Sequence, residues 1–122
     1  MERLVRTGLL YDFYGGLLTA KQQKALELYC LENWSLAEIA AQDGVSRQAV
    51  HDLLHRSERI MEDFEEKLGL LERFLNQKTV LNIISTQIKE VLLTVPENNI
   101  TYKKLLAINQ QLVQLIESET EV

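Results

Sequence analysis

The sequence predicts an all-α protein: a four-helix N-terminal domain with a helix-turn-helix, followed by C-terminal helices. One proline and five glycines in 122 residues leave little room for loops. Hydrophobic residues make up 46% of the chain and recur at helical spacing through most of it. Residues 34–59 also show the pattern of two helices that cross through a short turn.

Two supporting helices precede this motif. The first is expected over residues 2–14, ends at Gly15-Gly16, and has an apolar side made of Leu4, Val5, Leu9, Leu10, Phe13 and Tyr14. A capping box of Thr19 and Gln22 predicts a second helix over about residues 20–32. Its apolar spacing places three residues toward the core, namely Leu26, Tyr29 and the structural thiol of Cys30.

The helix-turn-helix itself is predicted from capping and packing residues. Ser35 and Glu38 form a capping box, and Gly44 can end the first helix in a left-handed conformation. Val45 then gives the turn an apolar residue to bury. Ser46 caps the second helix, whose inward residues follow the spacing that a steep helix crossing needs: Ala40, Gly44, Val50 and Leu53 or Leu54.

The outward face of the second helix is the predicted DNA-binding surface. Arg and Gln pair bidentately with guanine and adenine edges, so Arg47 and Gln48 at the helix start are expected in the major groove. Arg56 and Arg59 suit phosphates. The candidate site is Ser46, Arg47, Gln48, His51, Asp52, His55, Arg56 and Arg59. The alternative is a solvated polar face on a core-packed helix pair.

Three segments of the chain resemble one family. Residues 28–40, 45–52 and 62–68 look like those of the YlxM family, small bacterial proteins whose helix-turn-helix is similar to region 4 of sigma-70 factors. The resemblance covers about residues 1–75. From the sigma-like comparison, the residues that match the start of the recognition helix are Ser46, Arg47, Gln48 and His51.

The resemblance implies a function as well as a fold. Genes of this family typically lie beside the gene for the signal recognition particle GTPase. Membership therefore implies a DNA-binding regulator, which could act on genes of that pathway. It also implies an alternative, a protein-binding accessory factor that contacts the particle's GTPase or its RNA. The family has no catalytic residues to carry over.

The charge balance favours that alternative. The chain carries 13 basic and 18 acidic residues, a net charge of −5. Residues 34–59 sum to −1 and residues 60–75 to −3. Nucleic-acid-binding proteins usually present a basic patch. If the protein binds DNA, one copy offers few basic residues, so two copies would have to contribute their basic residues to the same DNA.

Other function classes lack their motifs. The sequence has no glycine-rich phosphate loop and no nucleophile beside a base, so we expect no enzyme, no cofactor and no small-molecule substrate. His51 and His55 could share a metal only with Asp52 and Glu58 as further ligands, so no metal is expected. The sequence shows neither a long apolar stretch nor a signal peptide, which predicts a cytoplasmic protein without membrane contact.

The second helix of the motif is expected to be long. A heptad-like spacing predicts one helix from Arg47 to about Gln77, roughly 45 Å long, with a break or kink at residues 76–79. Its seam is Val50, Leu54, Ser57, Met61, Phe64, Leu68, Leu71 and Leu75. Residues 1–60 would then form the helix-turn-helix domain and residues 61–122 a helical extension.

The extension is the predicted homodimerisation region. Helices over residues 78–95 and 101–117 should form an antiparallel hairpin around Pro96, and residues 118–122 are expected to fray. The predicted dimer interface is Met61, Phe64, Leu68, Leu71 and Leu75. The alternative is a monomer in which the hairpin folds back over this seam as a lid.

Overall fold

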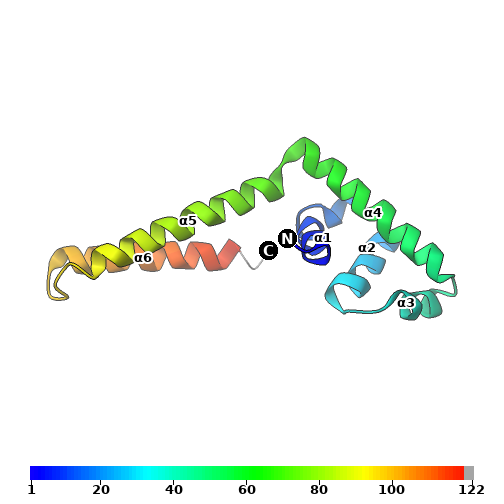
Figure 1. The fold of residues 1–122 in the computed structure, drawn as a ribbon, viewed down its shortest axis with the longest axis horizontal. Coiled ribbons are helices and arrows are strands. Elements are labelled where there is room, and N and C mark those ends of the chain that lie inside the picture. Colours follow the sequence, from blue (N-terminus) through cyan, green and yellow to red (C-terminus); the bar gives the residue numbers. More distant parts are fainter. Residues whose placement is uncertain (120–122) are drawn as a thin grey trace. The chain divides into compact units, whose positions relative to one another are not determined.

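The computed structural model describes residues 1–119 and is built from helices, with no strand in that range (Figure 1). The α-helices are α1 (Arg3–Tyr14), α2 (Ala20–Leu26), α3 (Leu36–Asp43), α4 (Arg47–Leu68), α5 (Leu70–Leu92) and α6 (Ile100–Glu119). A 3₁₀ turn, η1 (Gly15–Leu17), follows α1, and a π-helical segment, η2 (Glu27–Leu31), extends α2. The all-α prediction is confirmed.

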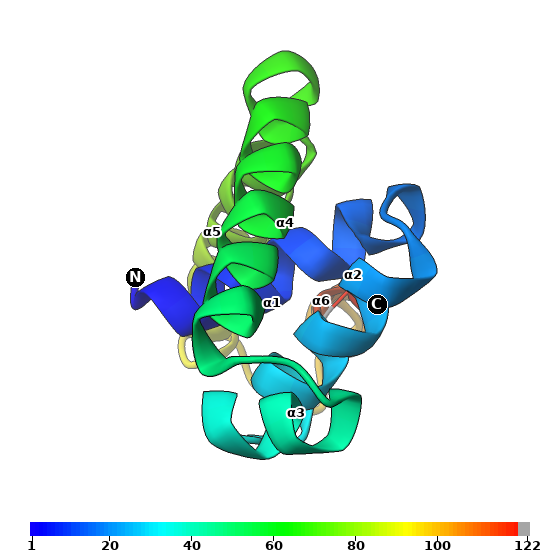
Figure 2. The ribbon, with the colours of Figure 1, turned by 90° about the vertical axis from the view of Figure 1, so that its right-hand side faces the viewer.

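The chain divides into two compact units, Met1–Glu72 and the part from Arg73 onward, and each is described by itself. In the first unit, α1, α2 and α3 pack against α4 (Figure 2). Its core is apolar and includes Leu10, Tyr14, Leu26, Ile39, Val50, Leu54, Met61 and Leu71. Because each supporting helix buries one stripe against α4, this helix is the scaffold of the unit.

The predicted bounds of the first motif helix and the predicted start of the second are confirmed. Ser35 accepts a hydrogen bond from the Glu38 N–H, and the Glu38 carboxylate accepts one from the Ser35 N–H. Gly44 ends α3 with φ at 67°, which glycine adopts at little cost. Val45 departs from expectation, since its side chain is 42% exposed.

The second supporting helix departs from regular geometry after Leu26. The π-helical turn η2 adds a residue to the turn and shifts the side chains that follow. As a result Leu28 is buried, while Tyr29 and Cys30, which the 3.6-residue period places in the core, are only half-buried. A single-period reading of the sequence could not find this shift.

The expected continuous helix from Arg47 to Gln77 is wrong. Helix α4 ends at Leu68, Gly69 takes φ at 63°, and α5 begins at Leu70 and runs without a break through residues 76–79. The Glu65 carboxylate lies at the N-terminus of α5 and accepts hydrogen bonds from the N–H groups of Leu71 and Glu72, at 2.9 and 3.0 Å. These bonds satisfy donors that the start of a helix leaves free.

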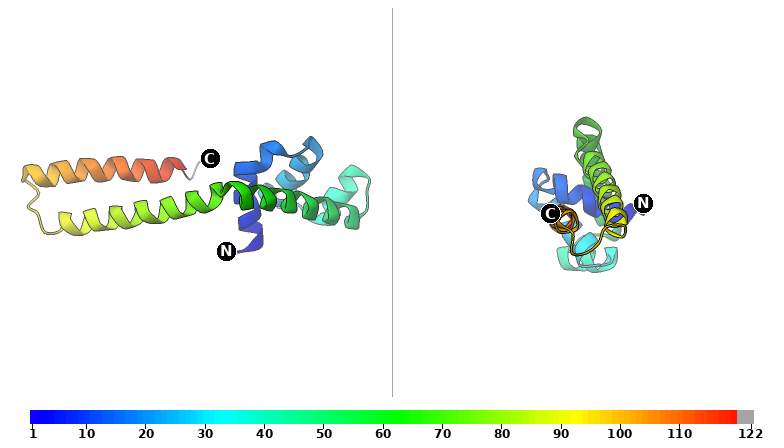
Figure 3. Two further views of the ribbon diagram at one scale, coloured as in Figure 1. Left: turned by 90° about the horizontal axis from the view of Figure 1, so that it is seen from above. Right: turned by 90° about the vertical axis from the view of Figure 1, so that its left-hand side faces the viewer.

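The second unit is a helical hairpin. Helices α5 and α6 lie side by side and antiparallel (Figure 3), joined by the turn that follows Pro96. The Asn99 side chain accepts from the Thr101 N–H at the start of α6. Between the two helices the Ser85 hydroxyl donates to Asn109 Oδ1 at 2.9 Å, and both side chains are buried. Of residues 118–122, which are expected to fray, the first two still belong to α6, and residues 120–122 lie outside the described residues.

Candidate nucleic-acid interface

The outward face of α4 carries every residue of the predicted DNA-binding set. Val50, Leu54 and Ser57 are 2%, 4% and 0% exposed, so they fix which side of the helix faces the core. All eight candidate residues lie on the other sides and are exposed: Ser46, Arg47, Gln48, His51, Asp52, His55, Arg56 and Arg59. The structure thus brings the set together on the surface of one helix.

The start of α4 is held by a helix cap and by a hydrogen bond between two side chains. The Ser46 hydroxyl accepts from the Ala49 N–H at 3.0 Å and so caps the helix. Gln48 Nε2 donates to Asp52 Oδ1, one helical turn further along α4, at 2.9 Å. A glutamine amide has a second N–H and a carbonyl oxygen, so Gln48 keeps one donor and one acceptor that this bond does not use.

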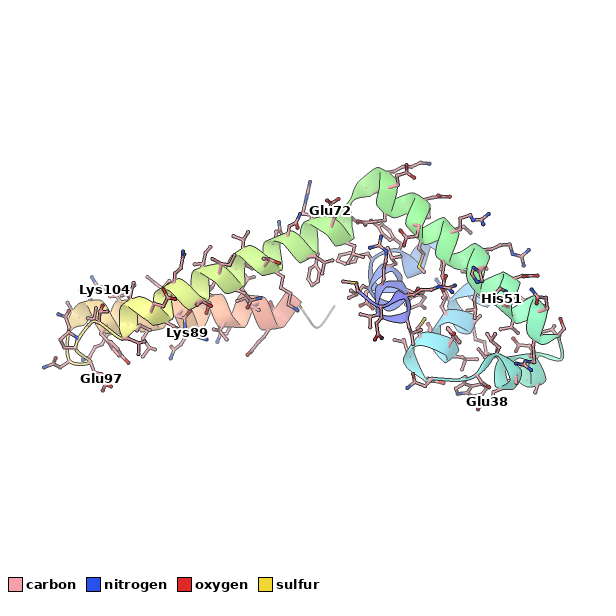
Figure 4. All side chains as sticks on the ribbon, viewed as in Figure 1. Glu38, His51, Glu72, Lys89, Glu97 and Lys104 are labelled. Atoms are coloured by element: carbon pink, nitrogen blue, oxygen red, sulfur yellow. The ribbon has the colours of Figure 1, made fainter. Side chains whose placement is uncertain are left out.

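Two histidines continue this surface toward α1. The His51 and His55 rings have centroids 4.2 Å apart, and His51 Nδ1 lies 3.6 Å from Asp52 Oδ1. Figure 4 labels His51 on the first half of α4. The guanidinium of Arg3 reaches across from α1 to 3.1 Å from His55 Nε2.

Two ion pairs join α1 to α4. Arg3 donates to Glu58 at 2.7 Å, and Arg6 donates through two nitrogens to the two oxygens of Glu62, at 2.6 and 2.8 Å. The hydrogen bond from Arg6 lowers the pKa of Glu62, and this effect outweighs the opposing effect of burial. Sequence reasoning placed neither arginine at the site, because they lie more than fifty residues from their partners along the chain.

The residues predicted for a dimer interface have different environments. Met61 and Leu71 are 0% and 1% exposed within the first unit, so the chain covers them itself. Phe64 stacks on Tyr14 with ring centroids 6.0 Å apart. Leu68 is 54% exposed, and Leu75 is half-buried. Met61 and Leu71 therefore cannot contribute to an interface while this unit is folded.

Three further features bear on function in the part of the chain that the structure describes, namely possible metal ligands, the reactivity of the Cys30 thiol and the length of apolar helices. No three His, Cys, Asp or Glu side chains there converge as a metal site. Burial raises the pKa of the Cys30 thiol to about 11, so the nucleophilic thiolate is scarce at neutral pH. None of these helices is long and apolar enough to cross a membrane.

Comparison with known proteins identifies the family. The profile of UPF0122, described as "Putative helix-turn-helix protein, YlxM / p13 like", matches residues 1–104. The chain belongs to this family. Its description names a helix-turn-helix protein.

Curated relatives from several bacteria agree with this assignment. YlxM of Bacillus subtilis is 46% identical over 82 residues, which cover 67% of this chain and 74% of the relative. A UPF0122 protein of Symbiobacterium thermophilum is 54% identical over 71 residues, or 58% of this chain and 66% of that protein. A UPF0122 protein of Halalkalibacterium halodurans is 39% identical over 112 residues, or 92% and 95% of the two chains.

Proposed function

We propose that this protein is a DNA-binding regulator that reads duplex DNA with the start of α4. The observation that carries the proposal is the exposed face of α4, which presents Arg47 and Gln48 as the first two residues of the helix. A helix of about 10–12 Å diameter fits the major groove, and the first residues of a recognition helix are the ones that reach base edges.

The remaining side chains on this face suit the same task. Arg56 and Arg59 lie further along α4, and among the described residues neither has an ion-pair partner. Both guanidinium groups are therefore available for phosphates, which supply the part of the affinity that does not depend on sequence. Asp52 can accept from a cytosine amino group, provided that Gln48 still orients it.

Binding to selected and scrambled duplexes at one fixed salt concentration tests this proposal. Arg47→Ala and Gln48→Ala should each reduce the preference for the selected sequence by about 1–3 kcal/mol, the contribution of one bidentate base contact. Arg56→Ala should weaken binding to both duplexes alike and serves as the control on the same helix. Unchanged preference in both groove variants would refute the recognition-helix assignment.

We also propose that two copies of the chain associate through the α5–α6 hairpin. This unit leaves nine large apolar side chains exposed: Val80, Ile83, Ile84, Val91, Leu93, Ile100, Leu106, Ile108 and Leu115. Burial of a fully exposed side chain of this size is worth about 1.5–3 kcal/mol, and each partly exposed one would contribute in proportion to the area that a partner covers. An open groove of about 490 Å³, lined by Val80, Leu81 and Leu115 with two amides, offers space for side chains of a second hairpin.

Charge and symmetry favour a second copy as the occupant of that groove. Basic and acidic residues nearly balance from Arg73 onward, so like charges do not oppose self-association. A two-fold dimer would also present two recognition helices, as half-site reading requires. Light scattering on the intact chain should give twice the chain mass, and Val80→Asp with Leu115→Asp should give a folded monomer. A wild-type monomer at micromolar concentration would contradict this proposal.

A second candidate function rests on the acidity of the first unit. Residues 1–72 contain eight basic and thirteen acidic residues, which is an unfavourable balance for a nucleic-acid-binding protein. The same fold could then serve as a protein-binding accessory factor of the signal recognition particle pathway. Co-purification with the particle's GTPase, together with no affinity for duplex DNA at low salt, would favour this second candidate.

A further inference from the structure

A cleft lies between α1 and α4, next to the proposed recognition surface. It has a volume of about 320 Å³, and we call it the α1–α4 cleft. Its charged and titratable lining is Arg3 and Arg6 from α1, and His55, Glu58, Arg59 and Glu62 from α4. Since His55 and Arg59 also belong to the outward face of α4, the cleft and that face share one surface.

The charges in the cleft are not fully compensated. Arg6 is neutralised by its two bonds to both oxygens of Glu62. Arg3 is held differently, because its Nε and one terminal nitrogen both donate to the same Glu58 oxygen, at 3.3 and 2.7 Å. A guanidinium has five N–H groups, and the Arg3 side chain is 65% exposed, so it keeps donors directed at solvent.

Arg59 supplies the excess charge. It is exposed, and within residues 1–119 it has no carboxylate partner. With Glu58 paired to Arg3 and Glu62 to Arg6, Arg59 leaves this cleft with one net positive charge when His55 is neutral. The excess lies beside Arg3 and His55, whose side chains are already 3.1 Å apart.

We propose that Arg3, His55 and Arg59 together bind one phosphate of the DNA backbone beside the groove that the start of α4 enters. Two guanidinium groups match the planar, multidentate recognition that phosphate favours. Glu58 positions Arg3 and also lowers the affinity, because its carboxylate competes for the same donors. This inference rests on the proposed function and adds α1, outside the helix-turn-helix, to the DNA-binding surface.

Salt titrations of a mixed-sequence DNA duplex by fluorescence anisotropy test the proposal. The variant with Arg3→Gln and Arg59→Gln together should lower the slope of log K against log salt by about 0.9, the value for one phosphate. Between about 50 and about 200 mM salt, the wild type should therefore lose roughly 3.5-fold more affinity than the variant. The variant with Lys24→Gln and Lys67→Gln together removes two positive charges outside the cleft, so it is the control with a matched change of charge.

Glu58→Gln gives the sharper comparison. It breaks the same ion pair as Arg3→Gln, but it leaves Arg3 charged and free, so it should tighten duplex binding while Arg3→Gln weakens it. Glu66→Gln, exposed on the same helix, controls for the general gain of positive charge. Arg3→Lys should recover only part of the wild-type affinity, because an ammonium lacks the guanidinium fork. Urea melts of each variant verify that α1 remains packed.

The outcomes separate this inference from the function on which it rests. If wild-type protein fails to bind duplex DNA at low salt, the proposed function is wrong. If wild-type protein binds but Arg3→Gln and Glu58→Gln both weaken binding, the ion pair is only structural and the phosphate site is refuted. If the variants alter binding to an RNA duplex of the same sequence and leave DNA binding unchanged, the assignment of the phosphate to DNA is overturned.

Discussion

Glu65 makes the most consequential polar contacts in the first unit, and its replacement is the clearest test of the fold. The side chain is 9% exposed, and its carboxylate accepts three hydrogen bonds. Oε1 accepts from the Tyr14 hydroxyl at 2.6 Å and from the Leu71 N–H at 2.9 Å, while Oε2 accepts from the Glu72 N–H at 3.0 Å. All three donors are fixed by helices or by the core.

Glu65→Gln keeps the shape of the side chain and replaces one acceptor with a donor. In its better orientation the amide oxygen replaces Oε1, and the NH₂ group then faces the Glu72 N–H. One bond to a charged group is lost and two donors are opposed, which should lower the free energy of unfolding by about 1.5–3 kcal/mol. Chemical denaturation by urea, followed by circular dichroism, measures this difference.

Glu66→Gln provides the matched control, because the neighbouring side chain is exposed and should change stability by less than about 0.5 kcal/mol. Tyr14→Phe removes a donor from the same network. Its effect should therefore not add to that of Glu65→Gln, with a coupling energy of about 0.5–3 kcal/mol. Equal stabilities of Glu65→Gln and Glu66→Gln would refute the capping role of Glu65.

The same network has a defined pH dependence. Desolvation raises the pKa of Glu65, but the hydrogen bonds from Tyr14 and from the N–H groups of Leu71 and Glu72 outweigh it, and the net shift is downward from 4.5. A lowered pKa in the folded state contributes stability above the unfolded-state value, and this stability is lost as pH falls through the folded value. The stability difference between wild type and Glu65→Gln should thus be constant near pH 7 and shrink below about pH 4.5.

Three further predictions concern other parts of the chain. Gly69→Ala should destabilise the first unit by about 1–2 kcal/mol in urea melts, because residue 69 has φ at 63°, which costs an alanine this much. No atom lies within 4 Å of the added Cβ, so a steric clash adds nothing. An unchanged urea midpoint would contradict this backbone conformation. Cys30, with a pKa of about 11, should react slowly with iodoacetamide at pH 8 in the folded protein and quickly in urea, as mass spectrometry would show; equal rates would contradict its burial. Leu93→Ser in the turn region, where the side chain is 88% exposed, should change the stability of the monomeric Val80→Asp, Leu115→Asp variant by less than about 0.5 kcal/mol in urea melts, and a larger loss would contradict its exposure in the single hairpin.

The helix-turn-helix could be derived from the sequence because its signals are local. Capping boxes and a glycine after a helix act within a few residues, and the structure reproduces both boxes and the left-handed Gly44. The outward face of α4 followed from the same local information. Once Val50 and Leu54 are assigned to the core, helical geometry fixes the sides on which the remaining residues lie.

The features that sequence reasoning missed depend on contacts between distant residues. The break at Gly69 is stabilised by Tyr14, whose hydroxyl accepts from the Leu70 N–H across more than fifty residues. The heptad-like spacing runs through the break without a change of phase, so the pattern alone predicts one helix. Arg3 and Arg6 likewise join the candidate site only through carboxylates on α4. The sequence offered a single indication of their role, which was that both are basic residues near the start of an amphipathic helix.

The cap that Glu65 forms on α5 has a practical consequence for dissecting the protein. The boundary between the two compact units falls after Glu72, inside the first turn of α5 and not in a loop. A fragment that stopped at residue 60 would lack Met61, Glu65 and Leu71, and would expose the apolar surface they cover. A fragment that retains the first turns of α5 keeps the Glu65 cap at the start of that helix and the buried Leu71. Any minimal DNA-binding piece of this chain should therefore be cut within helix α5, several residues beyond Glu72.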